Sequence, residues 1–322
     1  MSEPFFYSDI ESAKPFFTSH TPSNSPPPFT TGRLLWHLAL LVITGITTTL
    51  SGAIFPLLLR DIELVDIISM LGSDYTPIIN GLVFSFTLLT ILGTHELGHY
   101  IACRYYNVRA TLPYFIPVPP PLGIGTLGAF IRIKSPIYTR RALFDIGISG
   151  PLTGFVFALP AAVVGIYYGK PLTTPVTDLP IYFHHPLLFA LIAKLTGHSA
   201  TVEWNPIWFA CWVGMLATAL NLLPVGQLDG GHVVYALFGR RGHRFVAVFI
   251  TLLQAAVAYF AYTRYNWSGG FVYAAMLVLM LILRHPRVVD ETAPLDLTRK
   301  ILGIVALLVF ILSFMPVPLR IN

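Results

Sequence analysis

Charged residues are scarce in this chain. Only 11% of its 322 residues are Asp, Glu, Lys or Arg, whereas a typical soluble domain carries about 25%. Hydrophobic residues make up 55%, so too little polar side-chain surface remains to cover a globule in water. The composition therefore excludes an ordinary soluble domain and favours a protein whose solvent is the lipid bilayer.

The chain also lacks a cysteine framework and a basic patch. Its two cysteines, Cys103 and Cys211, both lie in apolar stretches, which excludes a disulfide scaffold and a CxxC redox motif. The net charge of +5 is spread over short loops between apolar runs, and no basic helix with interleaved aromatics is present. We therefore expect no nucleic-acid partner, and we interpret the positive charges as determinants of membrane topology.

Apolar periodicity is missing from residues 1–33, which are rich in proline and serine. Such a composition predicts a disordered tail. The segment has no basic start followed by a short apolar core, so it does not resemble a cleaved signal peptide. The predicted organisation is a tail over residues 1–33 and a transmembrane domain over residues 34–322.

Long apolar runs follow the tail. A helix needs about 20 mostly apolar residues to cross the hydrocarbon core. Two further apolar stretches, 61–72 and 181–196, are broken by polar residues, and we expect surface helices there. The predicted fold class is an all-α polytopic membrane protein of about seven transmembrane helices, at 34–56, 78–103, 143–168, 205–224, 244–263, 268–284 and 300–317.

The distribution of basic residues orients these spans. With the N-terminus in the cytoplasm, the inside segments hold 15 of the 20 Lys and Arg residues and the outside segments hold 5. This asymmetry agrees with the positive-inside rule. We therefore expect an integral, multi-pass protein with a cytoplasmic N-terminus, and we assign it to a prokaryotic cytoplasmic membrane.

The loop at 104–142 is unusual because it is apolar and rich in glycine and proline. Its residues 129–134 show a period-two alternation of side-chain types, which predicts a β-strand or hairpin. Non-helical backbone at membrane depth occurs only where it is buried in protein or lines a wet cavity. We expect a re-entrant loop or short β-hairpin near the functional site, and the alternative is an amphipathic loop on the cytoplasmic surface.

Polar groups inside spans are costly and usually functional. The second predicted span contains His95-Glu96-Leu97-Gly98-His99, an H-E-x-x-H pattern. Residues four apart share a helix face, so both imidazoles can reach one metal ion, and neutral imidazole suits zinc. Glu96 is then placed to accept a proton from a water ligand. The alternative is a satisfied polar cluster between helices.

Catalytic zinc sites generally use three protein ligands, so a third must come from elsewhere in the chain. We expect Pro224 to end the span at 205–224, and a glycine-rich turn then allows Asp229 to approach the ion before a second helical stretch begins at about residue 231. His232 is a rival ligand, and Cys103 shares a helix face with His99. Asp145, at a span end, is expected to be solvated by water or headgroups.

Together these motifs resemble the site-2 protease family of intramembrane zinc metalloproteases, peptidase family M50. The resemblance rests on His95-Glu96-Leu97-Gly98-His99, on the later Asn221, Pro224, Asp229 and Gly230, and on Gly150-Pro151-Leu152-Thr153-Gly154 in the third span. It covers about half of the chain, and the protease core is expected at about residues 78–240.

The resemblance implies an enzyme that hydrolyses peptide bonds of transmembrane proteins. It implies one zinc ion held by His95, His99 and Asp229, with Glu96 as the catalytic base and Asn221 near substrate or oxyanion. We further expect an unwound substrate to pair with the strand edge around Ile131 and Ile133.

The expected partners are membrane-protein substrates and the lipid bilayer. The alternative function is that of a catalytically inactive relative that binds membrane proteins. A metal transporter is disfavoured, because the polar residues gather at one point rather than along a path.

Overall fold

The computed structural model describes residues 31–59, 62, 64–175, 179, 181–283, 288–291 and 294–321. Two pairs of short strands occur in this part of the chain: β1 (Tyr114–Pro117) with β2 (Thr126–Phe130), and β3 (Ile181–Phe183) with β4 (Leu319–Ile321). The helices are α1 (Thr31–Leu58), α2 (Leu64–Ser73), α3 (Thr76–Tyr105), α4 (Arg140–Tyr167), α5 (Leu187–Thr196), α6 (Pro206–Asn221), α7 (Asp229–Tyr265), α8 (Gly269–Leu283) and α9 (Leu297–Ser313).

Four of these helices are long and apolar enough to cross a membrane, namely α1, α3, α4 and α7. They make the chain an integral membrane protein of mainly helical fold. The predicted spans at 205–224 and 268–284 correspond to α6 and α8, which are apolar but shorter, with 16 and 15 residues. The count of seven spans therefore stays a prediction.

Two of the predicted boundaries differ from the structure. The predicted tail lies outside the described residues up to residue 30, and α1 begins at Thr31, so residues 31–33 are helical. The stretch 181–196 is not one surface helix, because residues 181–183 form β3 and pair with β4. Its helical part, α5, buries Phe189 and Ile192 in the core. The buried face of α5 consists of Leu188, Phe189, Ile192 and Ala193.

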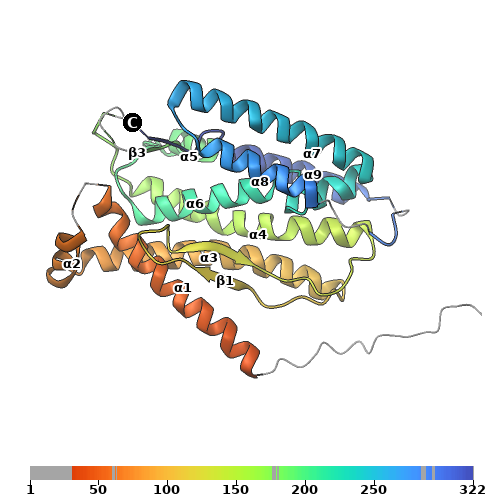
Figure 1. The fold of residues 1–322 in the computed structure, drawn as a ribbon, viewed down its shortest axis with the longest axis horizontal. Helices are drawn as coiled ribbons and strands as arrows, with labels where there is room; N and C mark the ends of the chain where they lie inside the picture. Colours follow the sequence, from red (N-terminus) through yellow and green to blue (C-terminus); the bar gives the residue numbers. More distant parts are fainter. Residues whose placement is uncertain are drawn as a thin grey trace, which may run out of the picture.

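Helix α4 lies at the centre of the molecule, with α3 on one side and α6 and α7 on the other (Figure 1). Close packing of α3 on α4 depends on a small residue at the crossing. A Cβ at Gly98 would lie 2.6 Å from the backbone oxygen of Ser149, so only glycine allows this approach. Small residues serve the same purpose at helix crossings in membrane proteins generally.

The main core cluster lies between α3, α4, α5 and α6. Phe84 and Leu88 of α3 pack there with Phe209 and Met215 of α6, all of them buried. Many large apolar side chains on the outer faces of the helices are exposed, as expected where lipid replaces water as the solvent. The core therefore fixes α3, α4 and α6 relative to one another.

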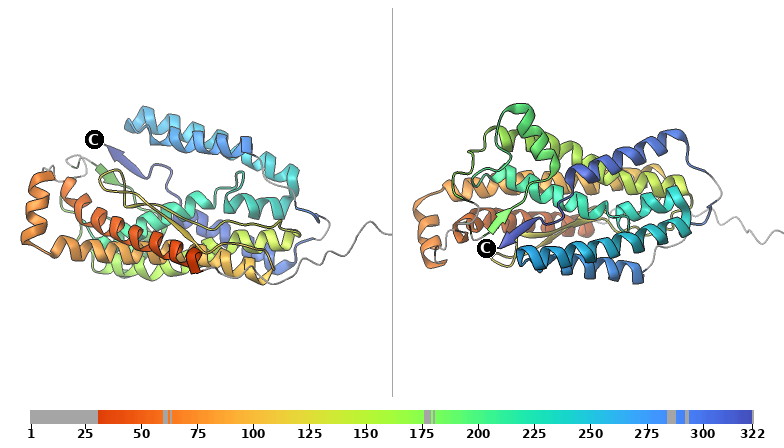
Figure 2. Two further views of the ribbon diagram at one scale, coloured as in Figure 1. Left: turned by 60° about the horizontal axis from the view of Figure 1, so that its bottom comes forward. Right: turned by 90° about the horizontal axis from the view of Figure 1, so that it is seen from above.

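The loop between α3 and α4 contains the antiparallel strands β1 and β2, which pair Tyr114 with Phe130. The strand predicted at 129–134 is shifted, since β2 ends at Phe130 and the rest of the stretch continues as an isolated bridge between Ala110 and Ile133. Alternation alone could not locate the strand start, because the partner strand sets it. The β1–β2 pair lies beside α1, and β2 also contacts α3 (Figure 2).

Candidate metal centre

Three helix segments bring polar side chains to one place. His95, Glu96 and His99 lie in α3, Asn221 is the last residue of α6, and Asp229 is the first residue of α7. Helix α6 ends three residues earlier than predicted, at Asn221 rather than Pro224, and α7 begins at Asp229 rather than near residue 231. The turn between them needs glycine.

Gly226 in this turn has a φ of +57°, a conformation that strains any residue with a Cβ. Gly230 lies against the preceding chain, because a Cβ there would be 1.9 Å from the backbone oxygen of Leu222. These two glycines let the chain reverse tightly between α6 and α7. The reversal directs the Asp229 side chain toward α3.

The ligand atoms of the site converge at nearly equal separations. His95 Nε2 and His99 Nε2 lie 3.2 Å apart, and each lies 3.2 Å from Asp229 Oδ2. Asn221 Nδ2 lies 3.4 Å from His95 Nε2. Glu96 Oε1 lies farther from the same nitrogen, at 4.0 Å. His95, Glu96 and His99 are all buried.

This arrangement fits a zinc ion. Ligand atoms held tetrahedrally at about 2.1 Å from zinc are about 3.4 Å apart, close to the 3.2 Å separations found here. Two imidazoles and one carboxylate form a donor set typical of catalytic zinc. His95 Nε2, His99 Nε2 and Asp229 Oδ2 form a three-atom cluster. The Glu96 carboxylate lies beside this cluster rather than in it, because its Oε1 is 4.0 Å from His95 Nε2.

A backbone oxygen orients one of the two imidazoles. His99 donates its Nδ1 proton to the carbonyl oxygen of Ile146 in α4, at 2.7 Å. Nε2 is then the unprotonated nitrogen and faces Asp229, which is how outer hydrogen bonds fix metal-binding histidines. The sequence did not reveal this contact, because a backbone acceptor has no residue-type signal.

The Gly-Pro segment of α4 makes room for both histidines of α3. A Cβ at Gly150 would lie 2.1 Å from His99 Nε2, and one at Gly154 would lie 3.1 Å from the His95 Cβ. Gly150 is therefore required sterically where the imidazole lies on the α4 backbone. This contact gives a physical reason for the glycines at 150 and 154.

The two alternative ligands lie in different surroundings. Cys103 is fully buried in a small apolar cluster with Val108 and Ile146. His232 lies one turn beyond Asp229 and packs beside α4, where a Cβ at Gly147 would be 2.7 Å from the His232 Cβ. Asp229 is the α7 residue whose carboxylate oxygen lies 3.2 Å from both α3 imidazoles.

The predicted substrate strand lies beside Glu96. The backbone of Ile131 interacts with the Glu96 carboxylate. On the other edge, Thr111 N donates to the oxygen of Arg132 at 3.0 Å, and Lys134 N donates to the oxygen of Arg109 at 2.7 Å. Because backbone groups alternate in direction along an antiparallel strand, those of Ile131 and Ile133 are turned away from residues 109–111.

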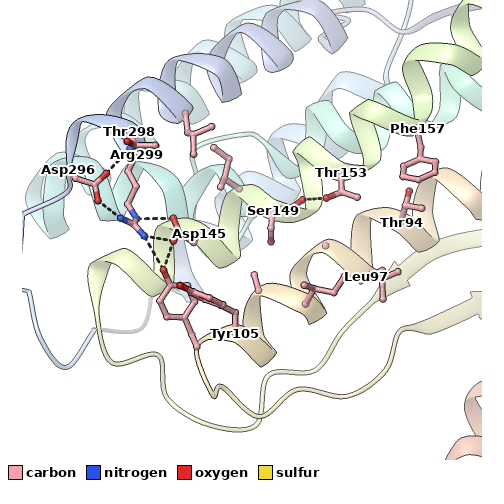
Figure 3. A pocket seen from close by; sticks show the side chains of 16 residues that line it. Thr94, Leu97, Tyr105, Asp145, Ser149, Thr153, Phe157, Asp296, Thr298 and Arg299 are labelled. Atoms are coloured by element: carbon pink, nitrogen blue, oxygen red, sulfur yellow. Dashed lines mark hydrogen bonds and ion pairs between the residues drawn. The ribbon is translucent and has the colours of Figure 1, made fainter.

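A second polar cluster lies where α3 ends and where α4 and α9 begin, and it was not predicted. Asp145, expected to be solvated, instead pairs with Arg299 of α9 at 2.6 Å and accepts a hydrogen bond from Tyr106. Arg299 also pairs with Asp296. The cluster lies at one end of a cavity of about 840 Å³ between α3, α4 and α9 (Figure 3). Contacts across 154 residues leave no local pattern in the sequence.

The mainly helical, apolar fold and the convergent His, His and Asp side chains are typical of a membrane protein with a candidate metal centre of the metallohydrolase type. The sequence model of peptidase family M50 matches residues 83–262, which include His95, Glu96, His99, Asn221 and Asp229. This chain belongs to peptidase family M50, and the resemblance to the site-2 proteases is confirmed.

Two relatives from Arabidopsis thaliana give the scale of the similarity. The probable zinc metalloprotease EGY1, chloroplastic, is 31% identical over 73% of this chain and 43% of its own length. The probable zinc metalloprotease EGY2, chloroplastic, is 28% identical over 83% of this chain and 47% of its own length. The chain thus spans less than half the length of these relatives.

A solved structure, the site-2 protease from Methanocaldococcus jannaschii, is 17% identical and covers 72% of this chain and 90% of that chain, with a TM-score of 0.34. Both plant relatives carry the word chloroplastic in their names. The expectation of a metalloprotease class is confirmed at the level of the family. The expectation of a prokaryotic cytoplasmic membrane gains no support from these relatives.

Proposed function

We propose that this chain is an intramembrane zinc metalloendopeptidase that hydrolyses peptide bonds of transmembrane protein substrates. The observation that carries the proposal is the convergence of His95 Nε2, His99 Nε2 and Asp229 Oδ2 at 3.2 Å from one another. These three residues would hold one zinc ion. Membership of a metalloprotease family and relatives named as zinc metalloproteases support the same assignment.

When bound, zinc would act as a Lewis acid on the scissile carbonyl and would lower the pKa of a water ligand toward ~7. Glu96 carries the proton. Its carboxylate takes the proton from the attacking water and returns it to the leaving amine, the usual role of a general base that turns into an acid. Glu96 suits this role because it lies 4.0 Å from His95 Nε2, beside the donor atoms without joining them.

Asn221 would hold the substrate carbonyl near the metal. Its amide nitrogen lies 3.4 Å from His95 Nε2, so an N–H group is available close to where negative charge develops on the carbonyl oxygen. A donor placed there stabilises the transition state more than the ground state.

The backbone around Ile131 and Ile133 would bind substrate as an added strand. A helical peptide bond is shielded by its own turn, so a transmembrane substrate must unwind before it is cut. An extended segment can then pair with a free strand edge through main-chain hydrogen bonds. Along the edge that faces away from residues 109–111, the backbone of Ile133 would offer these hydrogen bonds, and the backbone of Ile131 lies beside the Glu96 carboxylate.

The topology proposed is multi-pass, with the N-terminus on the side that carries the excess of basic loop residues. Helices α6 and α8 would then complete a set of seven spans with α9. Their short lengths of 16, 15 and 17 residues fit positions inside the bundle or in a locally thinned bilayer.

A single comparison tests the proposed activity. Purified protein in detergent, loaded with zinc, is mixed with a fluorogenic transmembrane peptide, and cleavage is followed for wild type and for Glu96→Gln. Cleavage that requires zinc and is lost in the variant supports the enzyme. Zinc binding without cleavage in the wild type would support the alternative, an inactive relative that binds membrane proteins.

A further inference from the structure

A pocket of about 760 Å³ lies between α7, α8 and the turn that precedes Asp229, apart from the metal centre. Its polar end contains Arg240, Arg244, His243 and Tyr235, and none of its lining residues is acidic. The opposite walls are apolar and come from both helices. We propose that this pocket binds an anionic phospholipid, with the phosphate at the arginines and an acyl chain between the helices.

The first argument is the unbalanced positive charge. Arg240 and Arg244 are four residues apart, so they share one face of the second half of α7. Among the described residues, neither guanidinium has a carboxylate within ion-pair distance. Glu291, which accepts the hydrogen bond of the Tyr235 hydroxyl, is a neighbouring acid, and it does not line the pocket.

The second argument is the local backbone. Helix α7 is interrupted at Gly239, which has a φ of +69° and a ψ of −177°. The interruption begins a new helix at Arg240, so both arginines lie within the first turns of the segment that continues to Tyr265. The end of α8, near Ile282, returns to the same level because the two helices form an antiparallel hairpin (Figures 1 and 2).

The third argument is the apolar wall. Val248 of α7 and Val278 and Ile282 of α8 line the pocket, and they are 42%, 47% and 69% exposed. A free phosphate ion would leave these side chains uncovered, whereas a lipid places its acyl chain against them. Basic pockets between transmembrane helices bind anionic lipid headgroups for the same electrostatic reason.

The inner wall of the pocket connects it to the rest of the fold. Gly226 and Met280 form this wall, and a Cβ at Gly226 would lie 2.6 Å from the backbone oxygen of Met280. The turn before Asp229 therefore packs directly on α8. A lipid that holds α7 and α8 together also stabilises this turn, so binding raises the melting temperature of the protein.

The test uses purified full-length protein in detergent and two phospholipids with identical acyl chains, phosphatidylglycerol and phosphatidylcholine. Lipid retention is measured by native mass spectrometry, and the melting temperature is measured with and without lipid. The variant is Arg240→Gln/Arg244→Gln. The control is Arg109→Gln/Arg241→Gln, which removes the same charge from exposed arginines that do not line the pocket.

Wild type and control should retain phosphatidylglycerol in preference to phosphatidylcholine and gain melting temperature from it. The pocket variant should bind phosphatidylglycerol about 30-fold more weakly, because each arginine near a headgroup contributes about 1 kcal/mol. Its melting temperature without lipid should match that of the control, which shows that it folds.

Three results would overturn the proposal. Equal loss of retention in both double variants would mean that surface charge alone attracts the lipid. Equal retention of the two phospholipids by wild type would mean that the headgroup is not recognised. Displacement of bound phosphatidylglycerol by millimolar inorganic phosphate would identify a soluble anion as the ligand. Unchanged phosphatidylglycerol binding by Val278→Asn would support that conclusion, because the apolar wall would then contribute nothing to binding.

Discussion

His99 donates a hydrogen bond from Nδ1 to the backbone oxygen of Ile146 at 2.7 Å. The bond joins the helix that carries the H-E-x-x-H pattern to the central helix α4. It also selects the tautomer whose Nε2 lone pair faces Asp229. The metal centre therefore depends on how α3 packs on α4, and substitutions at that crossing should affect metal binding without touching a ligand.

Gly150→Ala tests this dependence. The added Cβ would lie 2.1 Å from His99 Nε2, which forces the ring out of place, so zinc content per purified protein should fall well below one. Gly154→Ala is the matched variant, since its Cβ would lie 3.1 Å from the His95 Cβ and needs only a small adjustment. Metal analysis of both variants decides the matter. Equal zinc content in the two would show that the crossing does not position His99.

Glu96→Gln tests the proton carrier. Glutamine keeps the size of the side chain and cannot accept the proton, so cleavage of a transmembrane peptide should fall by about 10²–10⁴-fold, the usual contribution of acid–base catalysis. Zinc content should not change, because Glu96 is outside the three-atom cluster. Full activity with bound zinc would refute the general-base assignment.

Asp229→Ala and His232→Ala distinguish the proposed third ligand from its rival. Loss of Asp229 should weaken zinc affinity by more than the ~10–100-fold that outer-shell partners usually cost, because its Oδ2 lies 3.2 Å from both imidazoles. His232→Ala should keep most of the metal. Zinc titration of the two purified variants measures the difference, and the reverse order of affinities would assign the ligand to His232.

The topology is checked with single cysteines in a background that lacks Cys103 and Cys211. Lys134 and Lys170 are exposed and lie in loops that the proposal puts on opposite sides. An impermeant thiol reagent added outside should label Lys170→Cys and spare Lys134→Cys. The opposite pattern would invert the orientation.

The convergence of His95, His99 and Asp229 could be predicted from sequence, because residue type and spacing carry the signal. His95 and His99 share a helix face, and Asp229 follows a glycine turn. Ile146 and Gly150 were not assignable to roles, since one acts through its backbone oxygen and the other through the absence of a side chain. The pairing of Asp145 with Arg299 was not predicted. The sequence around Asp145 is the same whether its carboxylate is solvated by water or paired with a residue far along the chain.

Secondary structure was predictable where the apolar run is long. It was less predictable where pairing with another strand sets the bounds of a strand. Helices α1, α3, α4 and α7 overlap the predicted spans. The strand predicted at 129–134 was misplaced, because β2 ends where its pairing with β1 ends, at Phe130 opposite Tyr114. Pairing between strands is a long-range property, and alternation in one strand cannot specify it.

The last prediction concerns the strand edge beside Glu96. Ile133→Pro removes a backbone donor on the edge turned away from residues 109–111, whereas Ile133→Ala keeps the donor and removes only side-chain contact. If substrate pairs with this edge, the proline variant should be roughly tenfold less active than the alanine variant, the loss expected for one or two hydrogen bonds. Cleavage rates at equal zinc content measure the difference.

Arg132→Pro is the control for damage to the loop itself. The nitrogen of Arg132 donates to Thr111 Oγ1 at 2.9 Å, so this proline breaks a bond on the inner edge and leaves the outer edge intact. Strand pairing predicts a larger loss of activity for Ile133→Pro than for Arg132→Pro. Ile131→Pro should resemble Ile133→Pro and also disturb Glu96, whose carboxylate interacts with the Ile131 backbone. If Arg132→Pro is as inactive as Ile133→Pro, integrity of the loop, and not pairing with substrate, explains the effect.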